Sequence, residues 1–425
     1  MNTNLTAPRD HSQLKIFLIL TALFFMSLAF CLATPIEIFR GLKQIILSRD
    51  LLITDYFALT NYGAAFFNSA LMMLLVLVII LQLKLPITGL TLAAFFINGG
   101  FALFGKNPFN VLPILFGTYL YSKIQGVSIK RYVYTALFGN CLAPLVTEIV
   151  YLLPFSLGIN IGFAILMGIV IGFTLPALSA HTASMHMGYS LFNVGFAAGI
   201  LGFVMVSILK AFGLDTNASL IWQEGIPIWL VIVLYSYFVI TFLYGVWINN
   251  GKINKVKRIF RHPGRAVADF ILMDGVGTTL MNMALVGSLS LSYILLIKGD
   301  LSGPVVGGIL TTFGFAAFGV HLKNFLPCLI GVYLATHIKI FTPTTPTIQL
   351  AALFSVSLAP IAGQFGVLAG ICAGILHTSI VTSTTQMYSG LNLYNNGFSS
   401  GIVAIIMVPL IESFMKNFTT SPSRR

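Results

Sequence analysis

Charged residues are scarce in this sequence. Only 8% of its 425 residues are Asp, Glu, Lys or Arg, and only 11 are acidic, whereas 57% are hydrophobic. Soluble domains carry about 25% charged residues, and here hydrophobic stretches long enough to cross a bilayer recur along the chain. The composition therefore predicts an integral membrane protein and leaves no room for a soluble catalytic domain.

Signatures of catalysis and of metal or nucleotide binding are also missing. The sequence has no GxSxG, Walker A, HExxH or Rossmann pattern in a supporting context. Its four cysteines lie in apolar runs at unrelated spacings, as expected of small buried hydrophobic residues. We therefore expect no cofactor, no metal site, no enzyme activity and no ATP-driven pumping by this chain alone.

The net charge of +12 does not indicate a nucleic-acid-binding protein. Lys and Arg lie in short loops beside apolar spans, a pattern typical of membrane topology signals rather than of a phosphate-binding surface. The densest group lies in residues 249–268, called the basic segment below, which reads NNGKINKVKRIFRHPGRAVA. We expect the basic segment to be a cytoplasmic loop.

One stretch of the sequence occurs twice. Residues 100–120 read GFALFGKNPFNVLPILFGTYL, residues 314–334 read GFAAFGVHLKNFLPCLIGVYL, and 12 of the 21 positions are identical. A second pair lies downstream, GYSLFNVGFAAGI from Gly188 and GLNLYNNGFSSGI from Gly390. The chain is therefore a duplication, with a first membrane repeat at 1–213 and a second at 214–425.

Each repeat is expected to contain seven hydrophobic elements. In the first repeat they are 16–33, 63–83, 86–105, 108–122, 132–154, 159–180 and 190–212; in the second they are 230–247, 277–297, 303–320, 325–340, 347–361, 363–380 and 390–413. Several are short and begin near Gly or Pro, which favours discontinuous or re-entrant helices, namely 108–122, 325–340, 347–361 and 363–380. Partly amphipathic segments at 36–50 and 250–265 are expected to lie at the surface as short helices. The sequence thus predicts an all-α polytopic membrane protein.

An odd number of crossings makes the two repeats inverted relative to each other. With the N-terminus inside, 16 of the 23 Lys and Arg fall inside and seven fall outside, including Lys106. This bias predicts a multi-pass protein of the bacterial inner membrane with both termini cytoplasmic and loop 214–225 outside. One re-entrant element in each repeat would instead make the repeats parallel, and the sequence leaves that alternative open.

Two pairs of asparagines are candidates for contact with a solute. Asn110 and Asn324 each lie three residues before a proline of the repeated stretch, where an amide either caps a helix break or contacts a solute. Asn193 and Asn395 occupy matching positions in the second motif. Tight helix packing explains the glycines around them but not the matched amides. The aromatic residues just before them, Phe192 and Tyr394, are candidates for the same reason.

One carboxylate and its counterpart complete the expected substrate-binding residues. Glu148 is the only Glu well inside an apolar span, and the second repeat has Gln364 at the aligned position. A buried Glu can bind a cation or relay protons, whereas Gln can only form hydrogen bonds. A neutral Glu148, or one that faces water, is the alternative. Asp55 and Asp269 match across the repeats at the entries to spans, where helix capping is expected.

The repeated stretch, the APLVTEI segment and the YSLFNVGFAAG/YNNGFSSG pair resemble an uncharacterised family of bacterial multi-pass membrane proteins. In that family a domain of unknown function occurs twice per chain, and the resemblance covers nearly the whole length. Residues 390–395 are also similar to the glycine–aromatic–asparagine signature of the urea transporter family. That resemblance implies a passive channel for small neutral solutes, but the family's Leu-Pro-x-x-Thr-x-Pro-Phe segment has no clear match here.

Taken together, these features predict a membrane transporter or channel for a small polar solute or ion, with its site at the interface of the two halves. Its expected partners are that solute and the lipid bilayer, with a homo-oligomer as a possible further assembly. The alternative is an intramembrane enzyme or lipid-handling protein that uses Glu148 and His181 or His186. The two histidines are five residues apart, which is not the spacing of a helical metal pair.

Overall fold

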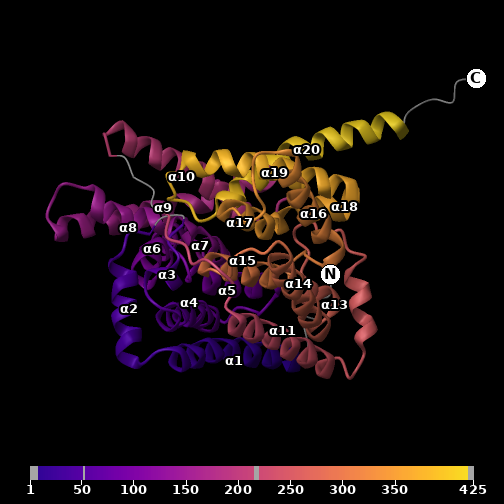
Figure 1. The fold of residues 1–425 in the computed structure, drawn as a ribbon. Coiled ribbons are helices and arrows are strands. Elements are labelled where there is room, and N and C mark those ends of the chain that lie inside the picture. The colour runs from indigo at the N-terminus through magenta and orange to yellow at the C-terminus, as the bar shows by residue number, and fades with distance from the viewer. Residues whose placement is uncertain (1–7, 51–52, 215–219, 420–425) are drawn as a thin grey trace, which may run out of the picture.

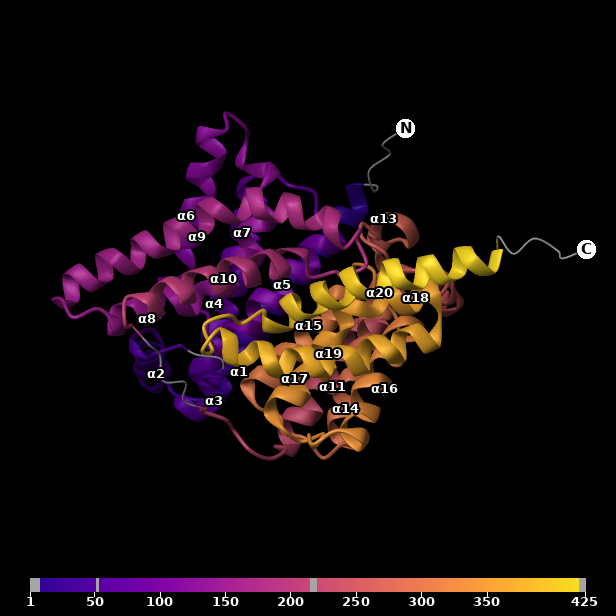
Figure 2. The same ribbon diagram turned by 90° about the horizontal axis from the view of Figure 1, so that it is seen from above.

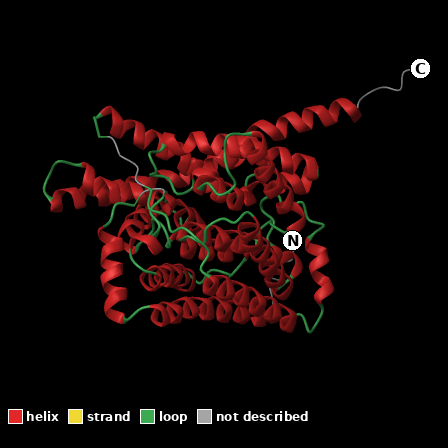
Figure 3. Cartoon of the chain, in the orientation of Figure 1, coloured by secondary structure: helices red, strands yellow, loops and turns green. Residues whose placement is uncertain are grey.

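The computed structural model describes residues 8–50, 53–214 and 220–419, and every regular element in this part of the chain is a helix (Figure 3). The helices of the first half are α1 (Pro8–Leu32), α2 (Pro35–Leu47), α3 (Tyr56–Leu59), α4 (Tyr62–Gln82), α5 (Gly89–Phe101), α6 (Pro108–Ile124), α7 (Val133–Gly139), α8 (Ala143–Leu152), α9 (Leu157–Met185) and α10 (Asn193–Ala211). Short 3₁₀ turns lie at Ile129–Arg131 and Asn140–Leu142.

The second half repeats this order. Its helices are α11 (Ile228–Ile248), α12 (Val256–Ile259), α13 (Phe270–Asp274), α14 (Val276–Leu296), α15 (Gly303–Phe315), α16 (Leu322–Ile338), α17 (Pro346–Phe354), α18 (Ala359–Phe365), α19 (Val367–Met387) and α20 (Asn395–Thr419), with 3₁₀ turns at Ile253–Lys255 and Ser355–Leu358. Ten helical segments of the described chain are long and apolar enough to cross a membrane. The predicted all-α polytopic architecture with two homologous halves is confirmed.

Matched helices of the two halves pack against each other in opposite directions. At one face of the molecule α1 lies beside α11 (Figure 1), and the ring of Phe17 stacks on Tyr244 while Phe24 stacks on Tyr237. Since residue numbers rise along α1 as they fall along α11, the two helices are antiparallel. At the opposite face α10 and α20 cross near their first residues and run to opposite sides (Figure 2).

The centre of the molecule is the crossing of α5 and α15, two 13-residue helices that are also antiparallel. Their backbones meet at Gly100 and Gly307: a Cβ atom on Gly100 would lie 2.6 Å from the Gly307 carbonyl oxygen, and one on Gly307 would lie 2.5 Å from the Gly100 oxygen. Only glycine permits this approach, so the two halves share one buried core rather than packing side by side.

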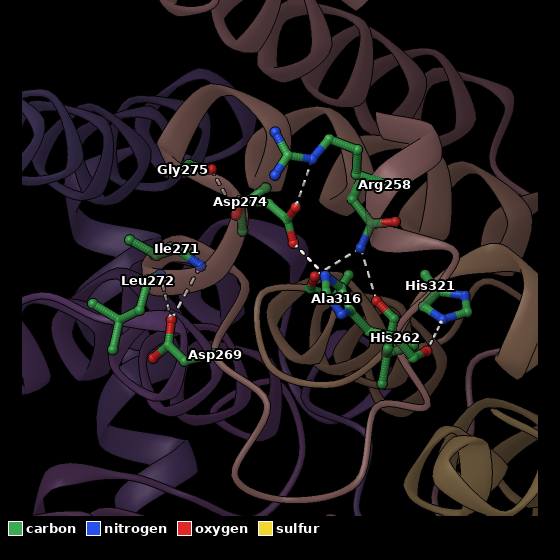
Figure 4. Close-up of polar contacts among 12 residues, drawn as sticks. Arg258, His262, Asp269, Ile271, Leu272, Asp274, Gly275, Ala316 and His321 are labelled. Carbon is green, nitrogen blue, oxygen red and sulfur yellow. Dashed lines mark hydrogen bonds and ion pairs between the residues drawn. The ribbon is translucent and has the colours of Figure 1, made fainter. Parts of the chain in front are cut away.

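Two matched aspartates tie the halves together. Asp55 caps α3 by accepting from the Phe57 N–H, and its carboxylate also accepts from the N–H of Gly303 at the start of α15. Asp269 caps α13 and accepts from the N–H of Gly89 at the start of α5 (Figure 4). The expected capping role is confirmed, but both side chains are buried rather than at the surface, because each also binds the opposite half.

The structure corrects several expected element boundaries. The segment expected as a short helix at 363–380 is the 21-residue α19, and the one expected at 347–361 is part of the segment Pro346–Phe365. That segment and its counterpart Val133–Leu152 are interrupted by 3₁₀ turns, so the helix breaks lie there. The elements expected to be short at 108–122 and 325–340 are the 17-residue helices α6 and α16, and the central helices α5 and α15 are shorter still. The loops that follow α5 and α15 are held by matched asparagines. Asn68 donates to the carbonyl oxygens of Ala102 and Lys106, and Asn282 donates to those of Ala316 and Val320.

The two amphipathic segments lie at opposite ends of the molecule. The surface helix α2 stands at the left of Figure 1 and the basic segment at the right, where α20 also ends. The Tyr244 hydroxyl donates to the Gln13 carbonyl, which places the beginning of α1 near the basic segment as well. We call these two sides the α2 end and the basic end.

Candidate functional site

A cavity of about 560 Å³ lies at the interface of the two halves. Its walls come from α7, from the end of α9 and the start of α10, from the basic segment, and from the residues around the end of α15. Tyr394 from the second copy of the downstream motif also lines it. Most of the lining is apolar, and no acidic side chain of the described chain lines it.

The mouth of the cavity faces the basic end. Arg265 lines it in an exposed position, where its Nε donates to the Met187 carbonyl oxygen at 2.6 Å and its guanidinium lies 4.6 Å from the centre of the Tyr189 ring. These contacts fix a positive charge at the entrance.

Asp274 anchors the basic segment to the second half (Figure 4). Its carboxylate accepts from His262 Nε2 at 2.8 Å and lies 3.8 Å from Arg258 Nε. The carbonyl oxygen of His262 accepts in turn from His321 Nε2 at 2.9 Å, which joins the segment to the start of α16. The position of Arg265 thus rests on a polar network in the second half.

One wall of the cavity is built on Asn193. Its Nδ2 donates to the carbonyl and hydroxyl oxygens of Ser179, both at 3.0 Å, and its Oδ1 accepts from Thr182 Oγ1 at 3.0 Å and from His186 Nε2 at 2.9 Å. The Gly188 N–H donates to His186 Nδ1, which assigns the ring proton to Nε2. Burial lowers the pKa of His186 below its ordinary value, so this imidazole is neutral.

Aromatic rings close the inner end of the cavity. The rings of Phe192 and Tyr394, matched residues of the two repeats, are stacked with their centres 5.7 Å apart. Phe192 also meets Phe315 at 4.8 Å, and Tyr394 meets Phe101 at 4.9 Å. This aromatic floor, Phe101, Phe192, Phe315 and Tyr394, lies where the two halves meet and separates the cavity from the centre of the molecule.

Lys106 lies behind the aromatic floor and has no exposed surface. Its Nζ donates to Asn140 Oδ1 and lies 5.0 Å from the centre of the Phe101 ring and 5.7 Å from that of Tyr394. Among the described residues no carboxylate forms an ion pair with it. A buried cation without a counter-ion is costly and usually functional. The assignment of Lys106 to an outside loop was wrong, because the loop after α5 ends inside the protein.

The predicted site residues divide into those at the cavity and those remote from it. Phe192, Asn193 and Tyr394 line the cavity, whereas Asn110, Asn324, Asn395, Glu148 and Gln364 do not. No hydrogen bond joins any two of the four predicted asparagines, and each has its own set of partners.

Asn110 and Asn324 stand in matched capping boxes. Asn110 pairs with Asn107 at the start of α6, and Asn324 pairs with His321 at the start of α16. Asn110 Nδ2 also donates to Asp50 Oδ2 at 3.0 Å. The capping alternative therefore describes the geometry of both residues.

Glu148 is buried and forms an ion pair with Arg49, which donates from Nε and Nη2 to the two carboxylate oxygens. Arg49 follows α2, so this pair lies at the α2 end, whereas Gln364 is exposed near Pro263 at the basic end. His181 is also exposed, and the described chain holds no group of three His, Cys, Asp or Glu residues that could bind a metal.

Three polar residues were missed because each lies at a position that reads as surface, either at the end of the amphipathic segment 36–50 or in a short loop. They are Arg49, Asp50 and Lys106, of which Asp50 is fully buried between Tyr56, Asn107 and Thr147. One signal in the sequence pointed to Lys106: the repeat aligns it with Val320, an apolar residue inside a motif otherwise shared by both halves. Of the cysteines, Cys141 and Cys328 are buried as expected, while Cys31 and Cys372 are exposed.

Comparison with known proteins identifies a family. A family described as a protein of unknown function (DUF1576) matches residues 34–211 and 248–413, one stretch in each of the expected halves. No curated protein and no solved structure matches the chain. The similarity to urea transporters inferred from residues 390–395 is not shown by these comparisons.

Proposed function

We propose that this chain, which belongs to the DUF1576 family, is a membrane transporter or channel for a small polar solute or ion. The observation that carries the proposal is the cavity between the two halves, open at the basic end and closed by matched aromatic residues of both repeats. Sites at repeat interfaces, near discontinuous helices, are typical of secondary transporters.

In this proposal the two repeats are inverted in the membrane. Matched helices that span a bilayer are antiparallel here, α1 with α11 for example, so the axis that relates the halves lies in the membrane plane. The α2 end and the basic end then face opposite sides. The density of Lys and Arg in the basic segment supports a cytoplasmic basic end of a bacterial inner-membrane protein, with both termini on that side.

The enzymatic alternative is less well supported. It needs Glu148 to act with His181 or His186, but Glu148 pairs with Arg49 at the α2 end, whereas His186 binds Asn193 near the mouth at the basic end. A general acid and base must both reach one reacting group. These side chains belong to separate clusters, so transport remains the function that the arrangement favours.

Flux measurements test the proposal. The purified protein is reconstituted in liposomes and exposed to a panel of small neutral polar solutes, organic anions and inorganic ions. We expect time-dependent entry of at least one class into protein-containing liposomes and not into protein-free ones. Absence of flux for every member of the panel, together with turnover of a lipid or peptide, would overturn the proposal in favour of the enzyme.

A further inference from the structure

A group of polar atoms buried inside the protein lacks hydrogen-bond partners. Within residues 388–395 four buried atoms have none in the described structure: the hydroxyl oxygens of Tyr388 and Tyr394, Asn392 Nδ2 and Asn395 Oδ1. A buried polar group without a partner costs roughly 1–3 kcal/mol. Four of them in one short segment are not explained by packing.

The internal duplication shows what this segment corresponds to. At the offset of the downstream motif, Tyr388, Asn392, Tyr394 and Asn395 match residues 186, 190, 192 and 193. Those four residues all line the open cavity. Every residue with an unpartnered atom in this segment is thus the counterpart of a cavity-lining residue.

The two segments are held in the same way by the opposite halves. The Leu191 N–H donates to the Ser357 carbonyl at 3.0 Å, and the matched Leu393 N–H donates to the Cys141 carbonyl at 3.1 Å. The exposure of their side chains differs, because Asn193 is half-buried at the cavity, whereas Asn395 is only 1% exposed. Since the basic end corresponds to the α2 end under the repeat symmetry, the counterpart of the cavity faces the α2 end.

We propose that a second solute site, closed in this structure, lies on the α2 side of the aromatic floor between Lys106 and residues 388–395, and that it takes a solute with a negatively charged group. It opens toward the α2 end when the cavity at the basic end closes. This inference rests on the proposed transport function and specifies its solute class.

The chemistry of the site favours an anion. Asn392 Nδ2 and the two phenol hydroxyls can each donate a hydrogen bond, and the Lys106 ammonium lies against the Tyr394 ring with Asn140 as its one hydrogen-bond acceptor in the described chain. Only Asn395 Oδ1 is restricted to accepting. An anionic group would give Lys106 the counter-ion that it lacks and would satisfy several donors at once.

Side-specific labelling of matched cysteines tests the site. Single cysteines are introduced into a variant without the four native ones. Ser190→Cys reports whether the cavity is accessible, and Asn392→Cys reports whether the proposed second site is. If Asn392→Cys does not fold, Tyr388→Cys takes its place. Each is treated with membrane-impermeant methanethiosulfonates in vesicles of known orientation. We expect Ser190→Cys to react from the basic end and Asn392→Cys from the α2 end. A bulky maleimide on Ser190→Cys should slow the reaction at 392 at least fivefold in the double variant.

The charge of the reagent tests the solute class. The modification rate of each reagent is divided by its rate with free cysteine. This relative rate at Asn392→Cys should be at least about fivefold higher for the anionic sulfonate reagent than for the cationic trimethylammonium reagent. Lys106→Met should bring this ratio close to one. Equal rates before that substitution would refute the anion assignment.

Failure of this inference is distinguishable from failure of the proposed function. If solute flux is measured in liposomes but neither Asn392→Cys nor Tyr388→Cys reacts from the α2 end, transport stands and the second site does not exist. The four atoms then bind structural water only. If both cysteines react, no solute of the panel crosses and the protein turns over a lipid or peptide, the opening is real and the transport proposal fails.

Discussion

Replacing Asn193 by leucine is expected to lower solute flux at least tenfold. Leucine keeps most of the volume but removes all four hydrogen bonds of the amide, which join Ser179, Thr182 and His186 into one wall of the cavity. Ser179 and His186, which line the cavity, would lose the amide that orients them, although the Thr182 hydroxyl keeps its bond to the Ser179 carbonyl. The wall would then no longer present a fixed set of polar groups to a solute. The measurement is initial uptake in liposomes of whichever solute of the panel crosses the wild-type membrane.

Asn160→Leu is the matched control for this variant. Asn160 lies on the same helix, α9, and is buried, but its Nδ2 donates to the carbonyls of Val150 and Leu153, away from the cavity. Both substitutions should lower the thermal stability by a similar amount, roughly 1–3 kcal/mol, whereas only Asn193→Leu should stop flux. Equal flux in the two variants would make Asn193 a structural amide without a role in the solute path.

Replacing Asp55 by alanine should prevent the two halves from assembling stably. The Asp55 carboxylate accepts from the backbone N–H groups of Phe57, Gln223 and Gly303 at 2.9–3.0 Å, and all three would lose their partner. Hydrogen bonds to a charged group contribute about 1.5–3 kcal/mol each, though not additively. We expect a loss of 3 kcal/mol or more, seen as a strong fall in folded yield and melting temperature in detergent.

Asp269→Ala should have a comparable effect, because Asp269 accepts from the N–H groups of Ile271 and Gly89, which match Phe57 and Gly303, and also from that of Leu272. Glu37→Ala is the control, since Glu37 closes the capping box of α2 at the surface and does not reach the opposite half. Its melting temperature should stay near that of the wild type. If all three variants had the same melting temperature, the aspartates would be simple helix caps and would not hold the halves together.

Sequence features that depend on local chemistry were predictable. Apolar runs identify spans, and matched aspartates before helices identify caps, because a short polar side chain there satisfies free N–H groups whatever the tertiary structure. The repeated stretch also predicted two homologous halves. Its glycines have a reason that the sequence does not show, namely the close approach of Gly100 to Gly307 across the centre.

Features that depend on long-range packing were not predictable. The partner of Glu148 lies 99 residues away in the chain, and Lys106 becomes buried only when α5, α7 and residue 394 come together. The separation of Asn110 from Asn324 has a geometric reason. A two-fold relation between antiparallel helices brings matched residues together only near its axis, as for Phe192 and Tyr394, and places Asn110 and Asn324 far from each other at opposite ends.

Blocking the cavity in a transporting preparation tests the central claim most directly. Ala183 lines the cavity near its mouth, so Ala183→Cys in the cysteine-free background can be modified there with a bulky membrane-impermeant maleimide applied at the basic end. Asn254→Cys, exposed in the basic segment but outside the cavity lining, is the matched control. The account predicts that modification at 183 lowers flux at least tenfold, whereas modification at 254 leaves it unchanged. Full flux through protein that is completely modified at 183 would contradict the claim that the cavity is one end of the solute path.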